Sequence, residues 1–197
     1  LYLRGGATVP TLDQNWLVTE NTFGSTVAAD KLGFRGMLIG NAQNFTVSKN
    51  TINGVVSSTG SISTMSGIQV ALLVSGGLVG QNKISDIKQI NTTGWGSNGI
   101  YLAASSTASN VTVANNFVFD VASYGYAGAT QGDNGYGIMV QSGGGYTIIY
   151  NSVLMSTDQT ATTGIPAAIN IASGVTTAGA IDLRNNIFAN IQTVGTR

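Results

Sequence analysis

Short apolar alternations recur along the chain at a nearly constant interval. The first kind starts with a glycine or alanine and continues with apolar residues at alternate positions; it occupies 36–39, 67–70, 99–102, 137–140 and 168–171. The residue after the glycine or alanine recurs after 31, 32, 38 and 31 positions. A short alternation of period two is typical of strands and not of helices. The pattern therefore predicts short strands separated by a regular repeat.

A second pattern trails these segments, with an earlier instance at 17–23, and contains asparagine. Apolar residues alternate on both sides of it, for example Val111 and Val113 before it and Phe117 and Phe119 after it. Successive instances lie 29 to 36 residues apart. The asparagines concerned are Asn21, Asn50, Asn82, Asn115, Asn116, Asn151, Asn185 and Asn186.

Together the two patterns predict three short strands in each repeat. One coil of three strands cannot bury its inward apolar side chains, whereas stacked coils bury them in one continuous column. We therefore expect an all-β fold, a parallel β-helix of about six coils. It forms a single domain over 1–197. Since neither terminus shows a polar capping helix, we expect this domain to be a segment of a longer chain.

The repeated asparagine suits the bend between two strands for two reasons. Asparagine tolerates the left-handed backbone conformation that a sharp bend needs. Its amide also hydrogen-bonds to the same residue in the next coil when the coils stack. We expect a structural asparagine ladder. Turn residues recur four positions later, at Gly54, Asp86, Asp120 and Asn190.

Composition excludes several classes of function. Only 8% of residues are charged, and the formal net charge is zero. A nucleic-acid-binding surface needs a basic excess, so we expect no nucleic-acid partner. The chain has no histidine and no cysteine, which removes imidazole and thiol chemistry and their metal sites. No apolar run approaches the length of a membrane span, so we expect no membrane insertion.

Several motifs resemble a known superfamily over nearly the whole chain. They are Gly135-Tyr136-Gly137-Ile138 and the segments 113–120, 150–153 and 183–190. The sequence resembles the right-handed parallel β-helix superfamily of pectate lyases, polygalacturonases and phage tailspikes. It is more similar to β-helix regions of very large surface proteins that bacteria export by type IX secretion. The resemblance implies a right-handed coil and a stalk or display module outside the cell or on its surface.

The acidic residues bear on enzymatic alternatives. A polygalacturonase-like site needs clustered Asp and a His, which this chain lacks. A pectate-lyase-like site needs acidic residues that hold Ca²⁺ beside an Arg or Lys base. Asp86 and Asp120 share a repeat position, so they form either a turn-stabilising ladder or a weak cation site. Arg184 is either a solvated side chain or, in the lyase alternative, the base.

Extra residues fall at one corner of the predicted coil, at 57–66, 88–98, 122–134 and 157–166. Insertions that share one corner build one face, and such a face is often used for binding. Aromatic and polar residues gather on two of these loops; they are Trp95, Tyr124, Tyr126, Gln131, Asp133, Asn134 and Tyr136. They either contact a sugar or pack the loops back onto the β-helix.

These observations lead to one preferred function and two alternatives. We expect a non-catalytic extracellular or cell-surface module that serves as a stalk, an adhesin or a glycan-contact surface. Its partners are a surface glycan or other cell-surface or secretion components. The first alternative is a polysaccharide-lyase-like enzyme, or the non-catalytic coils of one. The second is the shaft of a phage tailspike. We expect no cofactor, with Ca²⁺ as the one alternative.

Overall fold

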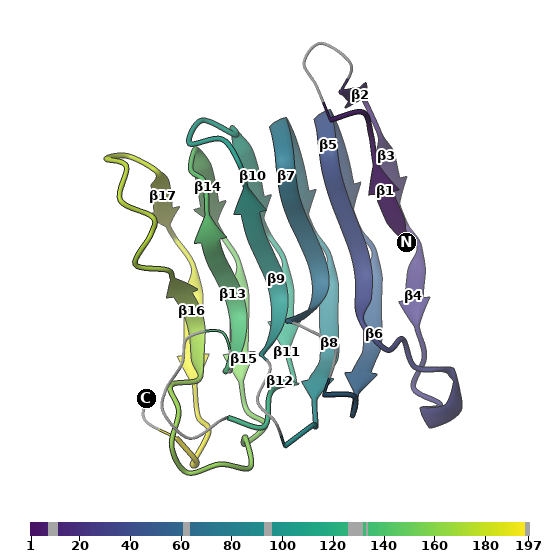
Figure 1. Cartoon of the computed structure of the whole chain (residues 1–197), viewed down its shortest axis with the longest axis vertical. Coiled ribbons are helices and arrows are strands. Elements are labelled where there is room, and N and C mark those ends of the chain that lie inside the picture. The colour runs from purple at the N-terminus through teal and green to yellow at the C-terminus, as the bar shows by residue number, and fades with distance from the viewer. Residues whose placement is uncertain (8–11, 61–63, 93–95, 126–131, 133, 196–197) are drawn as a thin grey trace.

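The chain winds into a parallel β-solenoid of about five turns, close to the predicted six coils. The computed structural model describes residues 1–7, 12–60, 64–92, 96–125, 132 and 134–195. Every strand pairing that it contains is parallel, and each strand pairs with its equivalents about one repeat away in the sequence (Figure 1). The predicted all-β parallel architecture is confirmed.

The strands lie on three faces of the solenoid, which we number in chain order. Two long strands, β5 (Arg35–Ser48) and β7 (Met65–Gly80), bend from face 1 into face 2. Face 1 also contains β1 (Tyr2–Arg4), β9 (Ser97–Ala104), β13 (Gly135–Ser142) and β16 (Ala167–Ile171). Face 2 also contains β2 (Asp13–Gln14), β3 (Leu17–Thr19), β10 (Val111–Ala114), β14 (Tyr146–Ile149) and β17 (Ile181–Arg184). Face 3 contains β4 (Thr22–Gly24), β6 (Thr51–Ser57), β8 (Lys83–Gln89), β11 (Phe117–Phe119), β12 (Val121–Ala122), β15 (Ser152–Met155) and β18 (Ile187–Asn190).

A short 3-10 helix, η1 (Ala28–Asp30), follows β4. In the described part of the chain, no helix has the length and apolar character needed to cross a membrane. The strands β6, β8, β12 and β15 end toward the lower edge of the view, so their ends share one corner of the solenoid (Figure 1).

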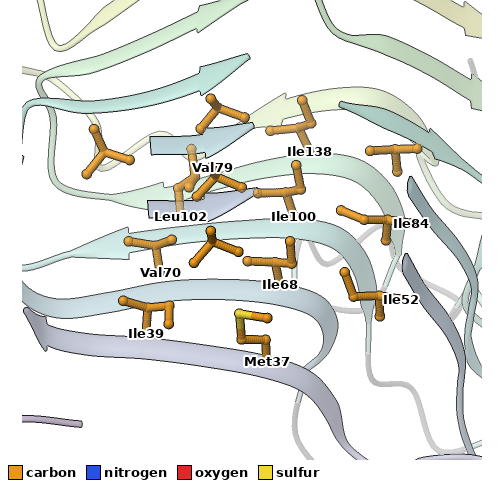
Figure 2. Close-up of a cluster of buried hydrophobic side chains, with 14 of the residues drawn as sticks. Met37, Ile39, Ile52, Ile68, Val70, Val79, Ile84, Ile100, Leu102 and Ile138 are labelled. Atoms are coloured by element: carbon orange, nitrogen blue, oxygen red, sulfur yellow. The ribbon is translucent and has the colours of Figure 1, made fainter. Parts of the chain in front are cut away.

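The interior consists of stacked columns of aliphatic side chains. On face 1, Met37, Ile68 and Ile100 are in register on successive coils and are fully buried. Figure 2 shows this column continuing to Ile138, beside a second column of Ile39, Val70 and Leu102. Parallel register aligns equal positions of successive coils, so an apolar alternation in one coil extends the column of the preceding coil. Stacking removes the inward-facing apolar side chains of each coil from water, and this burial is the main source of stability.

The glycine of the first pattern allows faces 1 and 3 to approach each other. A Cβ atom on Gly99 would lie 2.3 Å from the Cγ1 atom of Val118 and 2.6 Å from the carbonyl oxygen of Gly137. The equivalent Gly67 meets Ile84 in the same way, at 2.5 Å. A side chain at this position would collide with the core column of face 3, so four instances of the pattern have glycine there and only the last, at Ala168, has a side chain.

The predicted asparagine ladder corresponds to a continuous chain of hydrogen bonds inside the solenoid. In each link the backbone N–H and the side-chain Nδ2 of one asparagine donate to the Oδ1 atom of the next, at 2.8 to 3.1 Å. The members in order are Asn21, Asn50, Asn82, Asn116, Asn151 and Asn186. From Asn50 onward, Nδ2 also donates to a face 2 carbonyl oxygen of a preceding coil, as from Asn116 to Val79 at 2.9 Å.

The bend itself does not use these asparagines, which corrects the double role expected for them. The left-handed conformation belongs to the residue just before each ladder member, and Asn115 and Asn185 occupy that position with φ of 56°. The other residues there are Glu20, Lys49, Gln81 and Tyr150. Asn115 and Asn185 are exposed and lie outside the ladder bonds. The ladder amide must point inward, while the bend residue points to solvent, so one residue cannot serve both needs.

The strand β11 faces the opposite way from the predicted alternation. Val118 is fully buried and stacks on Ile84 and Val153, while Phe117 points outward and is 45% exposed. All three residues of β11 are apolar, so periodicity alone does not decide which of them points inward. Val118 packs directly against Gly99, where a Cβ atom would lie 2.3 Å from its Cγ1 atom. This reversal places two phenylalanines on the outer surface of face 3.

Candidate functional site

The predicted aromatic loop site is only partly described. Trp95, Tyr126, Gln131 and Asp133 lie outside the described residues. The structure describes the other three residues, Tyr124, Asn134 and Tyr136. The glycan contact assigned to these loops stays a prediction.

Tyr136 and Asn134 are both buried. Tyr136 is 1% exposed and forms a small apolar cluster with Met139 and Ala172. The Oδ1 atom of Asn134 accepts a hydrogen bond from the backbone N–H of Ile165 at 2.9 Å. Both residues line a cavity of about 10 Å³, which holds about one water molecule and no sugar ring. The burial of both side chains is typical of the packing role.

Tyr124 is half-buried at the start of the same loop, and its carbonyl oxygen accepts a hydrogen bond from the N–H of Ala161 at 2.8 Å. That bond joins the loop of one coil to the loop of the next. The connection supports the expectation that neighbouring insertions build one continuous surface at this corner.

Asp86 and Asp120 take part in an alternating row of lysines and aspartates at the edge of face 3. Lys31 lies 2.5 Å from Asp86, and Lys88 lies 3.0 Å from Asp86 and 2.8 Å from Asp120. Asp120 also accepts a hydrogen bond from the hydroxyl of Thr157. Both aspartates adopt positive φ at the kink of their strands. The row therefore stabilises this kink across successive coils.

In this Lys–Asp row, lysines occupy the two carboxylates of the predicted cation site. Burial alone would raise the pKa of Asp86, but hydrogen bonds and charges from Lys31 and Lys88 outweigh it and leave the pKa below its usual range. Burial would lower the pKa of Lys88, but its two aspartates raise it above the usual range. Ammonium groups thus neutralise the carboxylates that a Ca²⁺ ion would need. Among the described residues, no cluster of three or more potential metal-ligating side chains is present.

Arg184 is an exposed side chain on β17 whose guanidinium makes two 2.7 Å hydrogen bonds to the carboxylate of Asp182. This contact raises the pKa of Arg184 above its usual range. A guanidinium fixed in its charged form by a carboxylate is a poor base, so the described contacts favour the solvated role over the lyase role.

A groove of about 320 Å³ crosses the outer surface of face 3 beside the Lys–Asp row. Thr51 and Lys83 are paired on adjacent coils, as are Asn53 and Ser85, and these four residues line the groove. The parallel register brings them together because equal positions of successive coils point the same way. The groove therefore presents hydroxyl, amide and ammonium groups in two rows across the coils.

One end of the groove carries a pair of stacked aromatic rings. The rings of Phe117 and Phe119 lie 4.8 Å apart between centroids, with 29° between their planes. Phe119 lines the groove, and the ammonium of Lys83 lies 5.8 Å from its ring centroid. A cation at this distance is attracted to the ring face and helps to hold it. The sequence signal for this site was the Phe-Val-Phe segment, in which the alternation assigned both phenylalanines to the interior.

No protein-family model, curated protein or solved structure matches this chain. The likeness to pectate lyases and to type IX-secreted proteins, with the handedness that it implies, therefore stays a prediction.

Proposed function

We propose that the chain is a non-catalytic β-solenoid module that contacts a glycan through the groove on face 3. The observation that carries the proposal is the stacked Phe117–Phe119 pair, in which Phe117 is exposed and Phe119 lines the groove, beside a row of polar side chains. A sugar ring has an apolar C–H face and a polar rim of hydroxyl groups. A site that binds a sugar therefore needs an aromatic surface for the C–H face and hydrogen-bonding side chains for the hydroxyl groups.

The direction of the groove suits an extended saccharide. Its lining residues come from β6, β8 and β11, which lie on successive coils. Strands in a sheet repeat at about 4.8 Å, so successive sugar units meet similar side chains as the chain crosses the coils. Asp86 and Asp120 line the groove, and each forms an ion pair with a lysine outside it. The lysine that lines the groove, Lys83, forms no ion pair with these carboxylates and lies over the Phe119 ring.

The proposal places the module outside the cell or on its surface, as a stalk, an adhesin or a glycan-contact surface. The resemblance to exported β-helix regions supports this placement, and so does a surface with few charges. The groove is the part of that surface with the chemistry to recognise a partner.

The test is binding to a printed array of bacterial, plant and animal glycans, followed by calorimetry with the best oligosaccharide. We expect Phe117→Ala with Phe119→Ala to weaken binding at least about tenfold, because both stacking surfaces are lost. The control is Tyr150→Asn, which removes an exposed aromatic ring outside the groove and keeps a residue that tolerates its φ of 57°. Absence of binding to every glycan, or binding that the double variant leaves unchanged, would refute the proposal.

A further inference from the structure

A second pocket lies on face 1, away from the groove on face 3. It has a volume of about 310 Å³ and is lined by Leu1, Tyr2, Phe34, Arg35 and Leu38. Tyr2 and Leu38 are paired in register on adjacent strands, and Arg35 begins the strand that carries Leu38. The lining is mainly apolar and aromatic, with one guanidinium.

The guanidinium of Arg35 has no acidic partner among the described residues. Lys31, Lys49, Lys88 and Arg184 each contact a carboxylate, whereas Arg35 does not. Its carbon Cζ lies 3.7 Å from the centroid of the Phe34 ring, and its Nε atom is buried without a hydrogen-bond partner. Burial lowers the pKa of Arg35, although Tyr2 and Tyr101 partly oppose this. A guanidinium nevertheless stays charged in proteins.

A second arginine, Arg4 on the neighbouring strand β1, also lacks a carboxylate partner within the described part of the chain. Arg4 contacts the hydroxyl of Tyr2 at 3.5 Å. In a chain of zero net charge, this end of face 1 therefore has an excess of positive charge beside aromatic rings. An arginine that has already lost part of its hydration and has no carboxylate is well prepared to bind one, because its donors match a carboxylate in a bidentate arrangement.

We propose that this pocket binds an organic carboxylate, with the carboxylate on Arg35 and the apolar body of the ligand against Phe34 and Tyr2. An acidic sugar and an aryl-substituted acid share this chemistry. The proposal does not depend on the glycan groove, because the two sites lie on different faces and share no residue.

The test is calorimetry at low salt with two probes, D-glucuronate for the sugar source and hydrocinnamate for the aryl source. We expect one of them to bind and its methyl ester to bind at least about tenfold more weakly, because the charge-assisted hydrogen bonds are lost. Arg35→Gln should give a similar loss. Arg35→Lys should retain part of the affinity, since it keeps the charge and loses the bidentate geometry.

One control separates this site from general attraction of anions. Arg184→Gln removes an exposed arginine that Asp182 already holds, so binding should not change. Binding of neither probe to the wild-type protein, or binding that folded Arg35→Gln retains in full, would overturn the proposal.

Discussion

The asparagine ladder offers a sharp test of the fold, because the two members of one Asn-Asn pair have different roles. Asn116 is 1% exposed and its side chain donates to Val79 and Asn151. Its Oδ1 atom also accepts hydrogen bonds from the backbone N–H and the Nδ2 of Asn82. Asn115, the adjacent residue, is exposed and supplies only the left-handed bend.

The expected cost of Asn116→Ala follows from these contacts. Each intramolecular hydrogen bond contributes about 1 kcal/mol, and a buried group left without a partner costs about 1–3 kcal/mol. Asn116→Ala removes the acceptor for two donors of Asn82 and the donor for the Val79 carbonyl oxygen. We therefore expect the free energy of unfolding to fall by about 3–5 kcal/mol. Asn115→Ala should cost about 1 kcal/mol, the penalty of a left-handed alanine.

The assay is equilibrium urea unfolding followed by far-ultraviolet circular dichroism, with both variants and the wild type at one pH. Asn116→Asp is the isosteric control, because it keeps the acceptor but loses the donor to Val79. It should remain clearly less stable than the wild type. If Asn115→Ala costs as much as Asn116→Ala, the ladder is not what stabilises the bend and the reasoning is wrong.

Three further predictions concern packing and pH. Gly99→Ala should lower the free energy of unfolding by about 1–3 kcal/mol, because its Cβ would collide with the core, whereas Gly174→Ala, with open space around it, should leave it unchanged in the same unfolding assay. Burial raises the pKa of Tyr146 to about 12, although bonds to its hydroxyl partly oppose this. Its contribution to stability should thus be complete below about pH 10 and be lost as the pH rises through 12, and Tyr146→Phe should flatten this alkaline decline. The lowered pKa of Asp86 has the opposite sign: its contribution is present above about pH 4 and is lost as the pH falls further, so acid titration of Asp86→Asn should show a shallower loss of stability than the wild type.

Much of the fold was predictable from the sequence because a solenoid repeats its own pattern. A position that is apolar in one coil must be apolar in the next, so Ile68, Ile100 and Ile138 reveal the core column without any long-range information. The recurring asparagine was equally visible. The spacing between repeats also located the corner where the longer connections lie.

Other features depend on contacts that no local pattern records. In β11 the inward residue is Val118, which packs against Gly99 on another face, so the Phe-Val-Phe alternation gave the wrong orientation. The division of labour between Asn115 and Asn116 depends on backbone conformation and not on residue type. The ion pair of Lys31 with Asp86 spans 55 positions, which is nearly two repeats. In the sequence, Lys31 and Asp86 are two distant charged residues with no pattern that links them.

A nuclear magnetic resonance titration tests most directly whether the groove on face 3 binds a glycan. The best oligosaccharide from the array would be added to ¹⁵N-labelled protein while amide chemical shifts are followed. We expect the largest changes to cluster at Asn53, Ser85 and Phe119, which line the groove on successive coils. Changes confined to faces 1 and 2, or no saturable change at all, would contradict it.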